Sequence, residues 1–336
     1  MRPTTPSQVL KGQKIPALLI TDRVNIFYVT GAKMSRGALL ITARAITLFV
    51  DGRYIEEAKR SARKGITVQS DDGLGVALKQ VRRCGIEAEK VTVAQLGRIK
   101  RKYKNTKFIQ TAGIIEEFRR SKAPEELRAF RRAQRITHEM LRRIPAALTP
   151  GVTEKEIAWM LTTWAHELGA DELAFEPIVA FGTHTDSPHH SPTDRKLKKR
   201  DIVQIDTGAK YGGYCADQSR VFFVGKPTAL QQEVYDIVKQ AKDAATHAVQ
   251  AGVTNHRLDR IARAALREAN YEQYFFHSLG HGVGLEIHEG VSLSQKAKKM
   301  KLLANEIITI EPGVYIPGKF GIRLEDEVVV PSGLLP

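Results

Sequence analysis

Cysteine is scarce in this chain of 336 residues, which contains only Cys84 and Cys215. Neither belongs to a CxxC pair, so the sequence excludes a disulfide framework and a cysteine-rich zinc site. No apolar run approaches the roughly 18–20 residues that a helix needs to span a bilayer. The N-terminal residues lack the apolar stretch and the cleavage site of a secretory signal. We therefore expect a cytoplasmic location.

Acidic residues are few in the first third of the chain. Residues 1–120 contain 24 Lys and Arg against 10 Asp and Glu, whereas the rest of the chain contains 28 against 27. The basic excess includes the cluster RIKRKYKNTK at 98–107. Such a segment could attract phosphate backbones, but no helix-turn-helix, RNP or zinc-finger signature accompanies it. We interpret it as a solvated basic surface and do not expect a nucleic-acid partner.

Apolar periodicity divides the chain into two predicted domains, residues 1–120 and 121–336. The first contains strand-like patterns at residues 16–21, 38–43 and 45–51, and helical patterns at residues 54–64 and 75–83. This alternation is typical of an α/β domain. A lone GxG at residues 73–75 is weak evidence for a nucleotide site, and we interpret it as a turn.

The second domain mixes helices and strands. Thr153 with Glu156, and Thr228 with Gln231, are spaced as capping boxes ahead of apolar-periodic runs, which predicts a helix at each place. One more helical pattern lies at residues 255–269. Four strand-like stretches lie at residues 202–206, 213–225, 307–315 and 321–330. The pattern predicts an α+β domain.

Four carboxylates lie in or beside these strand-like stretches, where a sheet core disfavours them. They are Asp206, Asp217, Glu311 and Glu325. Each alone could be an exposed residue of an edge strand. Together they could not all stay ionised in a core without positive charge between them. A pair of divalent metal ions would offset the burial cost better than arginines, because one ion is shared among several ligands.

The segment HSLGHGVGLEIHE, residues 277–289, adds three histidines and two glutamates to this set. Oxygen-rich coordination with a single imidazole suits Mn²⁺, Co²⁺, Fe²⁺ or Zn²⁺. Two such ions could activate a shared water as a nucleophile at neutral pH. The residues therefore indicate a two-metal hydrolytic site.

Four segments in this order and spacing resemble those of the pita-bread metallopeptidases, in the branch of Xaa-Pro aminopeptidase and prolidase. They are DTGAKYGGYCADQSR, HSLGHGVGLEIHE, ITIEPGVY and GIRLEDE. LLITDRVNIFYVTGA and LFVDGRYIEEA also resemble the creatinase-like N-terminal domain of that branch. The resemblance covers almost the whole chain. It implies an α/β creatinase-like domain followed by an α+β pita-bread domain, and a homodimer.

The resemblance also implies two divalent metal ions, with Mn²⁺ preferred over Co²⁺, Zn²⁺ and Fe²⁺. The implied ligands are Asp206, Asp217, His281, Glu311 and Glu325. Asp217 and Glu325 would bridge the two ions. Ser219 stands where the family usually has threonine, which preserves the hydroxyl.

Five residues are implied to act in catalysis. They are Glu311 as proton carrier, His277 as hydrogen-bond donor to the oxyanion, His288 and His189 as substrate contacts, and Arg323 as an orienting residue. His190 and His184 are the alternatives to His189. For His277 and His288 the alternative is a structural histidine, and for Arg323 it is a structural ion pair.

The implied reaction is hydrolysis of the Xaa-Pro bond at the N-terminus of peptides that have proline at position two. The alternative is a prolidase, which accepts only the dipeptide and needs a cation for the proline carboxylate. A third hypothesis is a metal-free relative that binds histones or nucleic acid. The intact ligand set disfavours it.

Overall fold

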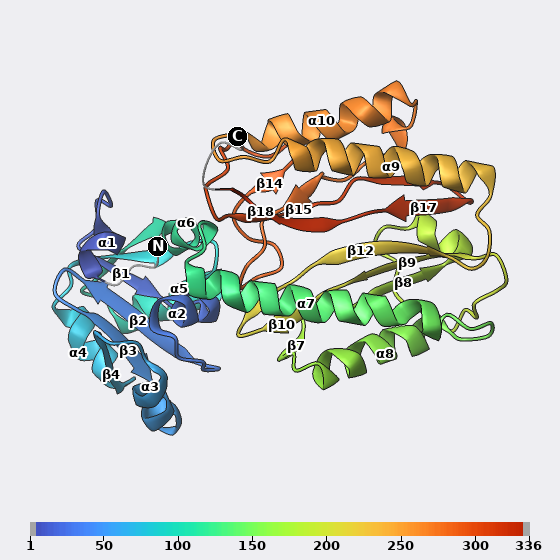
Figure 1. Ribbon diagram of the computed structural model, residues 1–336. Helices are drawn as coiled ribbons and strands as arrows, with labels where there is room; N and C mark the ends of the chain where they lie inside the picture. The colour runs from blue at the N-terminus through green and yellow to red at the C-terminus, as the bar shows by residue number, and fades with distance from the viewer. Residues whose placement is uncertain (1–4, 332–336) are drawn as a thin grey trace. The chain divides into compact units, whose positions relative to one another are not determined.

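The computed structural model describes residues 5–331 and divides the chain into two compact units, Met1–Arg119 and Arg120–Pro336 (Figure 1). The break lies next to the boundary that we placed after residue 120. No helix within residues 5–331 has the length and apolarity to cross a membrane.

The first unit is built on a six-stranded mixed sheet with the strand order β4-β3-β2-β1-β5-β6. Its strands are β1 (Ala17–Ile20), β2 (Gly37–Thr42), β3 (Ile46–Val50), β4 (Ile66–Ser70), β5 (Arg83–Glu87) and β6 (Lys107–Thr111). Its helices are α1 (Pro6–Leu10), α2 (Arg23–Thr30), α3 (Ile55–Ser61), α4 (Gly73–Lys79), α5 (Val93–Lys102) and α6 (Ile114–Arg120). Strand β1 runs antiparallel to β2 and parallel to β5.

One interpretation of this unit is wrong. The GxG at residues 73–75 does not form a turn, because Gly73 and Gly75 lie inside helix α4. Leu74 and Leu78 are buried in the cluster that also contains Phe49. Residues four apart share one face of a helix, so this apolar contact with the sheet outweighs the low helix propensity of the two glycines.

The second unit contains two pairs of helices on either side of several short sheets (Figure 1). The helices are α7 (Pro124–Ala147), α8 (Glu154–Glu167), α9 (Ala229–His247) and α10 (Asn255–Glu268). Helices α7 and α8 pack on the sheet of β8 (Ile178–Phe181), β9 (Ile202–Thr207) and β12 (Gln218–Phe223). Both predicted capping boxes are present, at Thr153 and Thr228.

Helices α9 and α10 belong to the core of the other half of this unit. Its hairpins pair β15 (Ile307–Ile310) with β18 (Asp326–Val329), and β16 (Gly313–Ile316) with β17 (Phe320–Arg323). The remaining strands are β7 (Glu172–Leu173), β10 (Ala209–Tyr211), β11 (Tyr214–Cys215), β13 (Gly280–His281) and β14 (Ser292–Leu293).

Three of the four predicted strands of this unit are each split in two at a carboxylate. The interruptions are Asp217 between β11 and β12, Glu311 between β15 and β16, and Glu325 between β17 and β18. Asp217 and Glu325 are buried despite leaving the ladders. The continuous strands that we predicted are therefore too long, because apolar content does not show where a ladder opens.

Gln204 of β9 joins the two halves of the second unit. Its side-chain carbonyl accepts a hydrogen bond from the backbone N–H of Arg323 at 2.8 Å, and its amide nitrogen donates to the Arg323 carbonyl at 3.1 Å. One buried side chain thus satisfies two backbone groups of β17. The contact fixes β17 beside β9, two residues before Asp206.

We expect Gln204→Leu to lower the free energy of unfolding by about 2–4 kcal/mol, because it leaves two buried backbone groups of Arg323 without this partner. Urea unfolding followed by tryptophan fluorescence measures this change in the second unit, since both tryptophans, Trp159 and Trp164, lie in α8. Gln232→Leu, on the exposed face of α9, is the control and should change stability by less than about 0.5 kcal/mol. Equal effects of the two substitutions would contradict the prediction.

Candidate metal centre

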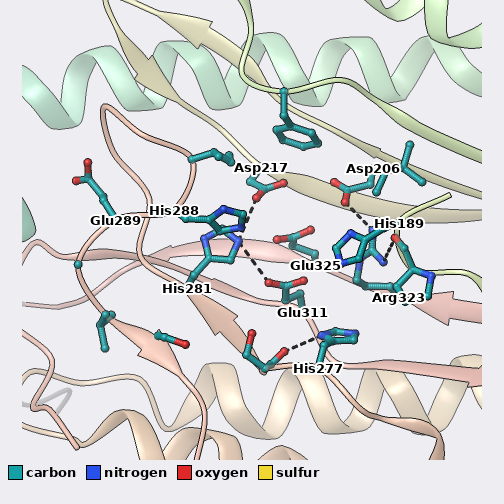
Figure 2. A pocket seen from close by; sticks show the side chains of 18 residues that line it. His189, Asp206, Asp217, His277, His281, His288, Glu289, Glu311, Arg323 and Glu325 are labelled. Atoms are coloured by element: carbon teal, nitrogen blue, oxygen red, sulfur yellow. Dashed lines mark hydrogen bonds and ion pairs between the residues drawn. The ribbon is translucent and has the colours of Figure 1, made fainter. Parts of the chain in front are cut away.

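The five predicted metal ligands line one cavity of about 600 Å³ in the second unit (Figure 2). They come from strand β9, the β11–β12 link, strand β13, the residue after β15, and the β17–β18 link: Asp206, Asp217, His281, Glu311 and Glu325. The other predicted site residues, His189, His277, His288 and Arg323, line the same cavity. The structure therefore brings together every residue that we assigned to the site.

The glycines beside His281 allow neighbouring backbone to approach. A Cβ atom at Gly280 would lie 2.1 Å from the carbonyl oxygen of Thr309, and one at Gly282 would lie 2.1 Å from that of Glu289. The backbone N–H of His281 donates to the Thr309 hydroxyl at 3.0 Å. A side chain at either glycine position would push His281 away from the carboxylates.

The spacing of the side chains around His281 fits a metal ion between them. Its Nε2 lies 3.5 Å from Asp217 Oδ2 and 3.4 Å from Glu311 Oε1. Charge-assisted hydrogen bonds are shorter, about 2.7–2.9 Å. Ligand atoms that each lie about 2.0–2.2 Å from one ion are separated by roughly 3.0–3.5 Å. Asp217, His281 and Glu325 offer ligand atoms within 4.8 Å of one another.

Two carboxylate oxygens in the cavity give a second test of fit. Asp206 Oδ1 and Glu325 Oε1 are buried and have no hydrogen-bond partner among the described residues. Their companion oxygens are held: Arg323 donates to Asp206 Oδ2 at 2.6 Å, and Ser219 donates to Glu325 Oε2 at 2.9 Å. Buried acceptors without partners are rare unless an ion or water satisfies them. The donor set therefore fits divalent cations.

The electrostatics of the cluster agree with this fit. Burial raises the pKa of Asp217 and Glu325 well above their usual range, and the neighbouring carboxylates raise them further. Burial raises the pKa of Glu311 to about 8, against the lowering effect of Arg323. Burial and the nearby His288 lower the pKa of His281 to about 4, which keeps its imidazole neutral, as a metal ligand must be. Without cations the cluster cannot be fully ionised at neutral pH.

Arg323 is buried, and each of its three guanidinium nitrogens donates a hydrogen bond. Besides Asp206, it donates to the Ser219 hydroxyl at 2.9 Å, to the Tyr315 hydroxyl at 2.9 Å and to the Pro188 carbonyl at 3.1 Å. Through Asp206 and Ser219 it fixes the positions of two predicted metal ligands. The ion pair of Arg323 is thus made with a predicted metal ligand, so a structural ion pair and an orienting role are compatible.

His277 has partners on both ring nitrogens. Its Nδ1 lies 2.8 Å from the Ser278 carbonyl, and its Nε2 lies 3.0 Å from the Tyr315 hydroxyl. Burial and Arg323 lower the pKa of His277 to about 3, so the ring is neutral. Nδ1–H then donates to Ser278, and Nε2 accepts the phenol proton. This geometry leaves no N–H for the oxyanion. Tyr315 was not among the residues that we predicted for the site, although it ends the segment ITIEPGVY.

His288 and His189 face the cavity with fewer constraints. The His288 ring packs edge-on against His281 with 4.1 Å between ring centroids. Within residues 5–331 neither His189 nor His288 makes a side-chain hydrogen bond to the protein. Their ring nitrogens are therefore available to a bound substrate.

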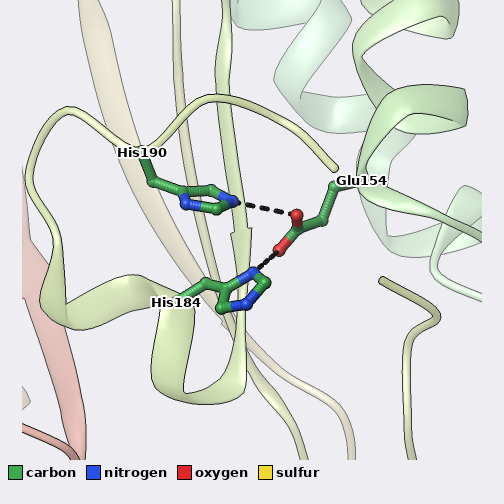
Figure 3. A group of neighbouring side chains, drawn as sticks. All are labelled: Glu154, His184 and His190. Carbon is green, nitrogen blue, oxygen red and sulfur yellow. Dashed lines mark hydrogen bonds and ion pairs between the residues drawn. The ribbon is translucent and has the colours of Figure 1, made fainter. Parts of the chain in front are cut away.

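The alternatives to His189 lie outside this cavity and bind Glu154 instead (Figure 3). The buried Glu154 carboxylate accepts from His184 Nδ1 at 2.9 Å and from His190 Nε2 at 2.9 Å. It also accepts from the backbone N–H of Phe181 and from the N–H and hydroxyl of Thr193. Although burial opposes ionisation, the hydrogen bonds from Thr193 and His190 hold its pKa below the usual range.

Glu154, His184 and His190 have the residue types of a zinc site, but their spacing indicates protons between them. Distances of 2.9 Å are hydrogen-bond lengths, whereas the predicted ligands around His281 are further apart. We infer that Glu154 anchors the loop that carries His189 to the first turn of α8. This role could not be predicted from the sequence, because Glu154 follows a cap residue, at a position where acidic side chains are common.

Replacing Glu154 by Gln should lower the free energy of unfolding by about 2–4 kcal/mol, since an amide N–H₂ would face donors in place of an accepting oxygen. Turnover should also fall, because the His189 loop loses its anchor. Urea unfolding and steady-state kinetics measure the two effects. Glu172→Gln, which removes the same charge from an exposed ion pair with Lys210, is the control. Unchanged stability in Glu154→Gln would rule out the anchoring role.

Comparisons with known proteins cover nearly the whole chain. Residues 128–332 match Metallopeptidase family M24, and residues 7–121 match the Creatinase/Prolidase N-terminal domain. The Xaa-Pro dipeptidase of Pyrococcus horikoshii is 34% identical over 318 residues, which are 94% of this chain and 90% of that protein.

Two solved structures are similar in fold as well as in sequence. The Xaa-Pro dipeptidase from Bacillus anthracis superposes with a TM-score of 0.93 at 30% identity, over 97% of this chain and 94% of that one. The X-Pro aminopeptidase from Thermotoga maritima superposes with a TM-score of 0.88 at 34% identity, over 95% and 93%. The predicted fold class, a creatinase-like domain followed by a pita-bread domain, is confirmed. The chain belongs to metallopeptidase family M24 and carries the N-terminal domain of the creatinase and prolidase type.

Proposed function

We propose that this metallopeptidase hydrolyses the Xaa-Pro bond at the N-terminus of peptides, as an Xaa-Pro aminopeptidase. One observation carries the proposal: the carboxylates and imidazole of a two-metal hydrolytic site converge on one cavity. The similar proteins bear the names of both Xaa-Pro aminopeptidases and Xaa-Pro dipeptidases, which supports the choice of bond. Prolidase is the alternative.

Two divalent ions, with Mn²⁺ preferred over Co²⁺, Zn²⁺ and Fe²⁺, would be held by Asp206, Asp217, His281, Glu311 and Glu325. An oxygen-rich donor set with a single imidazole suits all four ions, and the preference for Mn²⁺ comes from the resemblance to the family. Bound there, the ions would supply Lewis-acid polarisation of the scissile carbonyl and a nucleophile at neutral pH.

Protein side chains would move the protons and orient the substrate. Glu311, held by the Thr309 hydroxyl at 3.3 Å, would take a proton from the nucleophile and pass it to the leaving prolyl nitrogen. That nitrogen belongs to a tertiary amide without N–H, so it needs a proton to leave as an amine. His189 and His288 would contact the substrate around the scissile bond. His277 would hold the Tyr315 hydroxyl, and through it Arg323.

The charge of the cavity supports an aminopeptidase rather than a prolidase. Arg323 is the only Lys or Arg among the described residues that line it, and Asp206 neutralises it. Lys122 forms a buried ion pair with Glu289. The proline carboxylate of a dipeptide would therefore meet no uncommitted lysine or arginine in this cavity. In a longer peptide the proline has no free carboxylate, so no such cation is needed.

Other features stay predictions from the sequence. The resemblance implies a homodimer, and the lack of a signal pattern suggests a cytoplasmic location. A metal-free relative that binds histones or nucleic acid is disfavoured, because such a protein has no need of five metal ligands around one cavity.

Release of the first residue should be at least about tenfold faster, by kcat/KM, from Xaa-Pro-Yaa-Zaa than from Xaa-Pro, because burying an unpaired carboxylate costs more than about 1.4 kcal/mol. Amino-acid analysis of both digests with the Mn²⁺-loaded enzyme measures the ratio. Glu311→Gln and metal chelation should abolish both activities. Cleavage of the dipeptide alone would identify a prolidase, and activity in metal-free protein would refute the metallopeptidase assignment.

The metal-free protein should lose stability as the pH rises from 6.5 to 8. Its buried Glu311 has a pKa near 8 against an ordinary value of 4.5, so over this range the folded state binds more protons than the unfolded chain. Each extra proton lowers the free energy of unfolding by about 1.4 kcal/mol per pH unit. His277 and His281, whose pKa values are lowered to about 3 and 4, act in the opposite direction, and their effect fades as the pH rises past 6.5 because the unfolded imidazoles lose their protons there.

Urea unfolding at pH 6.5 and 8.0, with EDTA or with Mn²⁺, tests this prediction. With Mn²⁺ bound the ligands are ionised at both pH values, so the loss should disappear. An identical pH dependence with EDTA and with Mn²⁺ would show that cations do not bind the buried carboxylates.

A further inference from the structure

A second cavity, of about 720 Å³, lies within the first unit. Residues from β1, β2, α2, α4 and α5, and from the segments that follow β1, α2 and α5, line it. The proposed peptidase reaction uses none of them. Its volume is in the range of cavities that hold small organic ligands.

The cavity lies at the carboxyl end of β1. Strand β1 ends at Ile20, and Thr21 and Arg23, which follow it, both line the cavity. Strand β2 runs antiparallel to β1, so Gly37 at its beginning lies at the same edge. In open α/β sheets, ligands bind outside the carboxyl ends of strands. The position therefore suits a binding site.

The inner wall of the cavity is apolar. Leu19 of β1 and Leu74 of α4 are buried, and Ile99 of α5 and Tyr103 pack against the same core cluster. These four side chains line the cavity and offer an aliphatic and aromatic surface. Such a wall suits the apolar or aromatic body of a ligand.

The rim is cationic and carries no acid. Arg23, Arg36, Arg98 and Lys102 line the cavity, and no Asp or Glu does. Within residues 5–331 the guanidinium groups of the three arginines make no hydrogen bond or ion pair. The charge of Arg36 contributes to the lowered pKa of Asp51, but Asp51 makes its ion pair with Arg53. A concave site lined by charge of one sign attracts the opposite charge.

We propose that this cavity binds a phosphorylated aromatic anion of the nucleotide class. The planar body would lie on the wall of Leu19, Leu74 and Ile99, and the phosphates would accept hydrogen bonds from the arginines. Guanidinium groups match phosphate geometry with two parallel hydrogen bonds. Lys102 lies 5.5 Å from the centre of the Tyr103 ring, so charge and aromatic surface are adjacent. This site is separate from the proposed peptidase function.

A ligand of this cavity should carry both phosphate charge and an aromatic body, so probes that have one or both of these features test the proposal. ATP should bind the full-length protein saturably at one site in isothermal titration calorimetry at physiological ionic strength. Inorganic pyrophosphate should bind more weakly, because it lacks the aromatic body, and adenosine should not bind measurably, because it lacks phosphate. Absence of saturable ATP binding would overturn the proposal.

Two matched substitutions in helix α5 locate the site. Arg98→Gln should weaken ATP binding about tenfold, the usual effect of losing one charge-assisted hydrogen bond. Arg101→Gln removes the same charge from the same helix, but Arg101 does not line the cavity, so ATP affinity should change less than about twofold. Both variants should keep the peptidase activity of the parent protein, which verifies their folding.

A single-stranded RNA oligonucleotide provides the competing outcome. If the exposed basic residues act as a diffuse polyanion surface, RNA should bind more tightly than ATP, and Arg98→Gln and Arg101→Gln should weaken it equally. That result, or an equal loss of ATP affinity in the two variants, would refute a specific nucleotide site at this cavity. A specific loss of ATP affinity in Arg98→Gln alone supports it.

Discussion

Mutual repulsion among buried carboxylates is the constraint on which the second unit depends. Asp206, Asp217 and Glu325 are all buried, and Glu311 lines the same cavity. Burial and their mutual proximity raise the pKa of three of them: Asp217, Glu311 and Glu325. In a folded protein such a set is tolerated only when protons or cations neutralise it. The metal ions that would make the site reactive would thus also be what allows it to be buried.

The fold meets this constraint in two ways. Its strands are interrupted at the carboxylates, and neighbouring side chains hold one oxygen of a carboxylate in place. Asp217, Glu311 and Glu325 stand where ladders break, so their side chains turn into the cavity. Arg323 and Ser219 hold one oxygen each of Asp206 and Glu325 and leave the other oxygen open. Rigid support of this kind is what holds a ligand in a productive orientation.

Much of this arrangement could be predicted from the sequence, because its signals are local. Apolar runs gave β1, β2 and β3, and capping boxes gave the starts of α8 and α9. Acidic residues inside apolar stretches identified the candidate ligands, since burial of charge needs a reason. Residues whose roles depend on distant partners gave no such signal. Glu154 looks like an ordinary first-turn glutamate, yet it binds His184 and His190, and Tyr315 joins His277 to Arg323.

The amino-acid sequence by itself determined the family, the order of the two domains and the set of candidate metal ligands, because motif spacing and residue chemistry are properties of the chain. Only the tertiary structure decided which histidines face the cavity, that Arg323 is committed to Asp206, and that an unpaired cationic rim surrounds an apolar wall in the first unit. Each of these depends on distances between residues far apart in the chain, and a hydrogen bond, an ion pair or a ligand contact exists only at a particular distance.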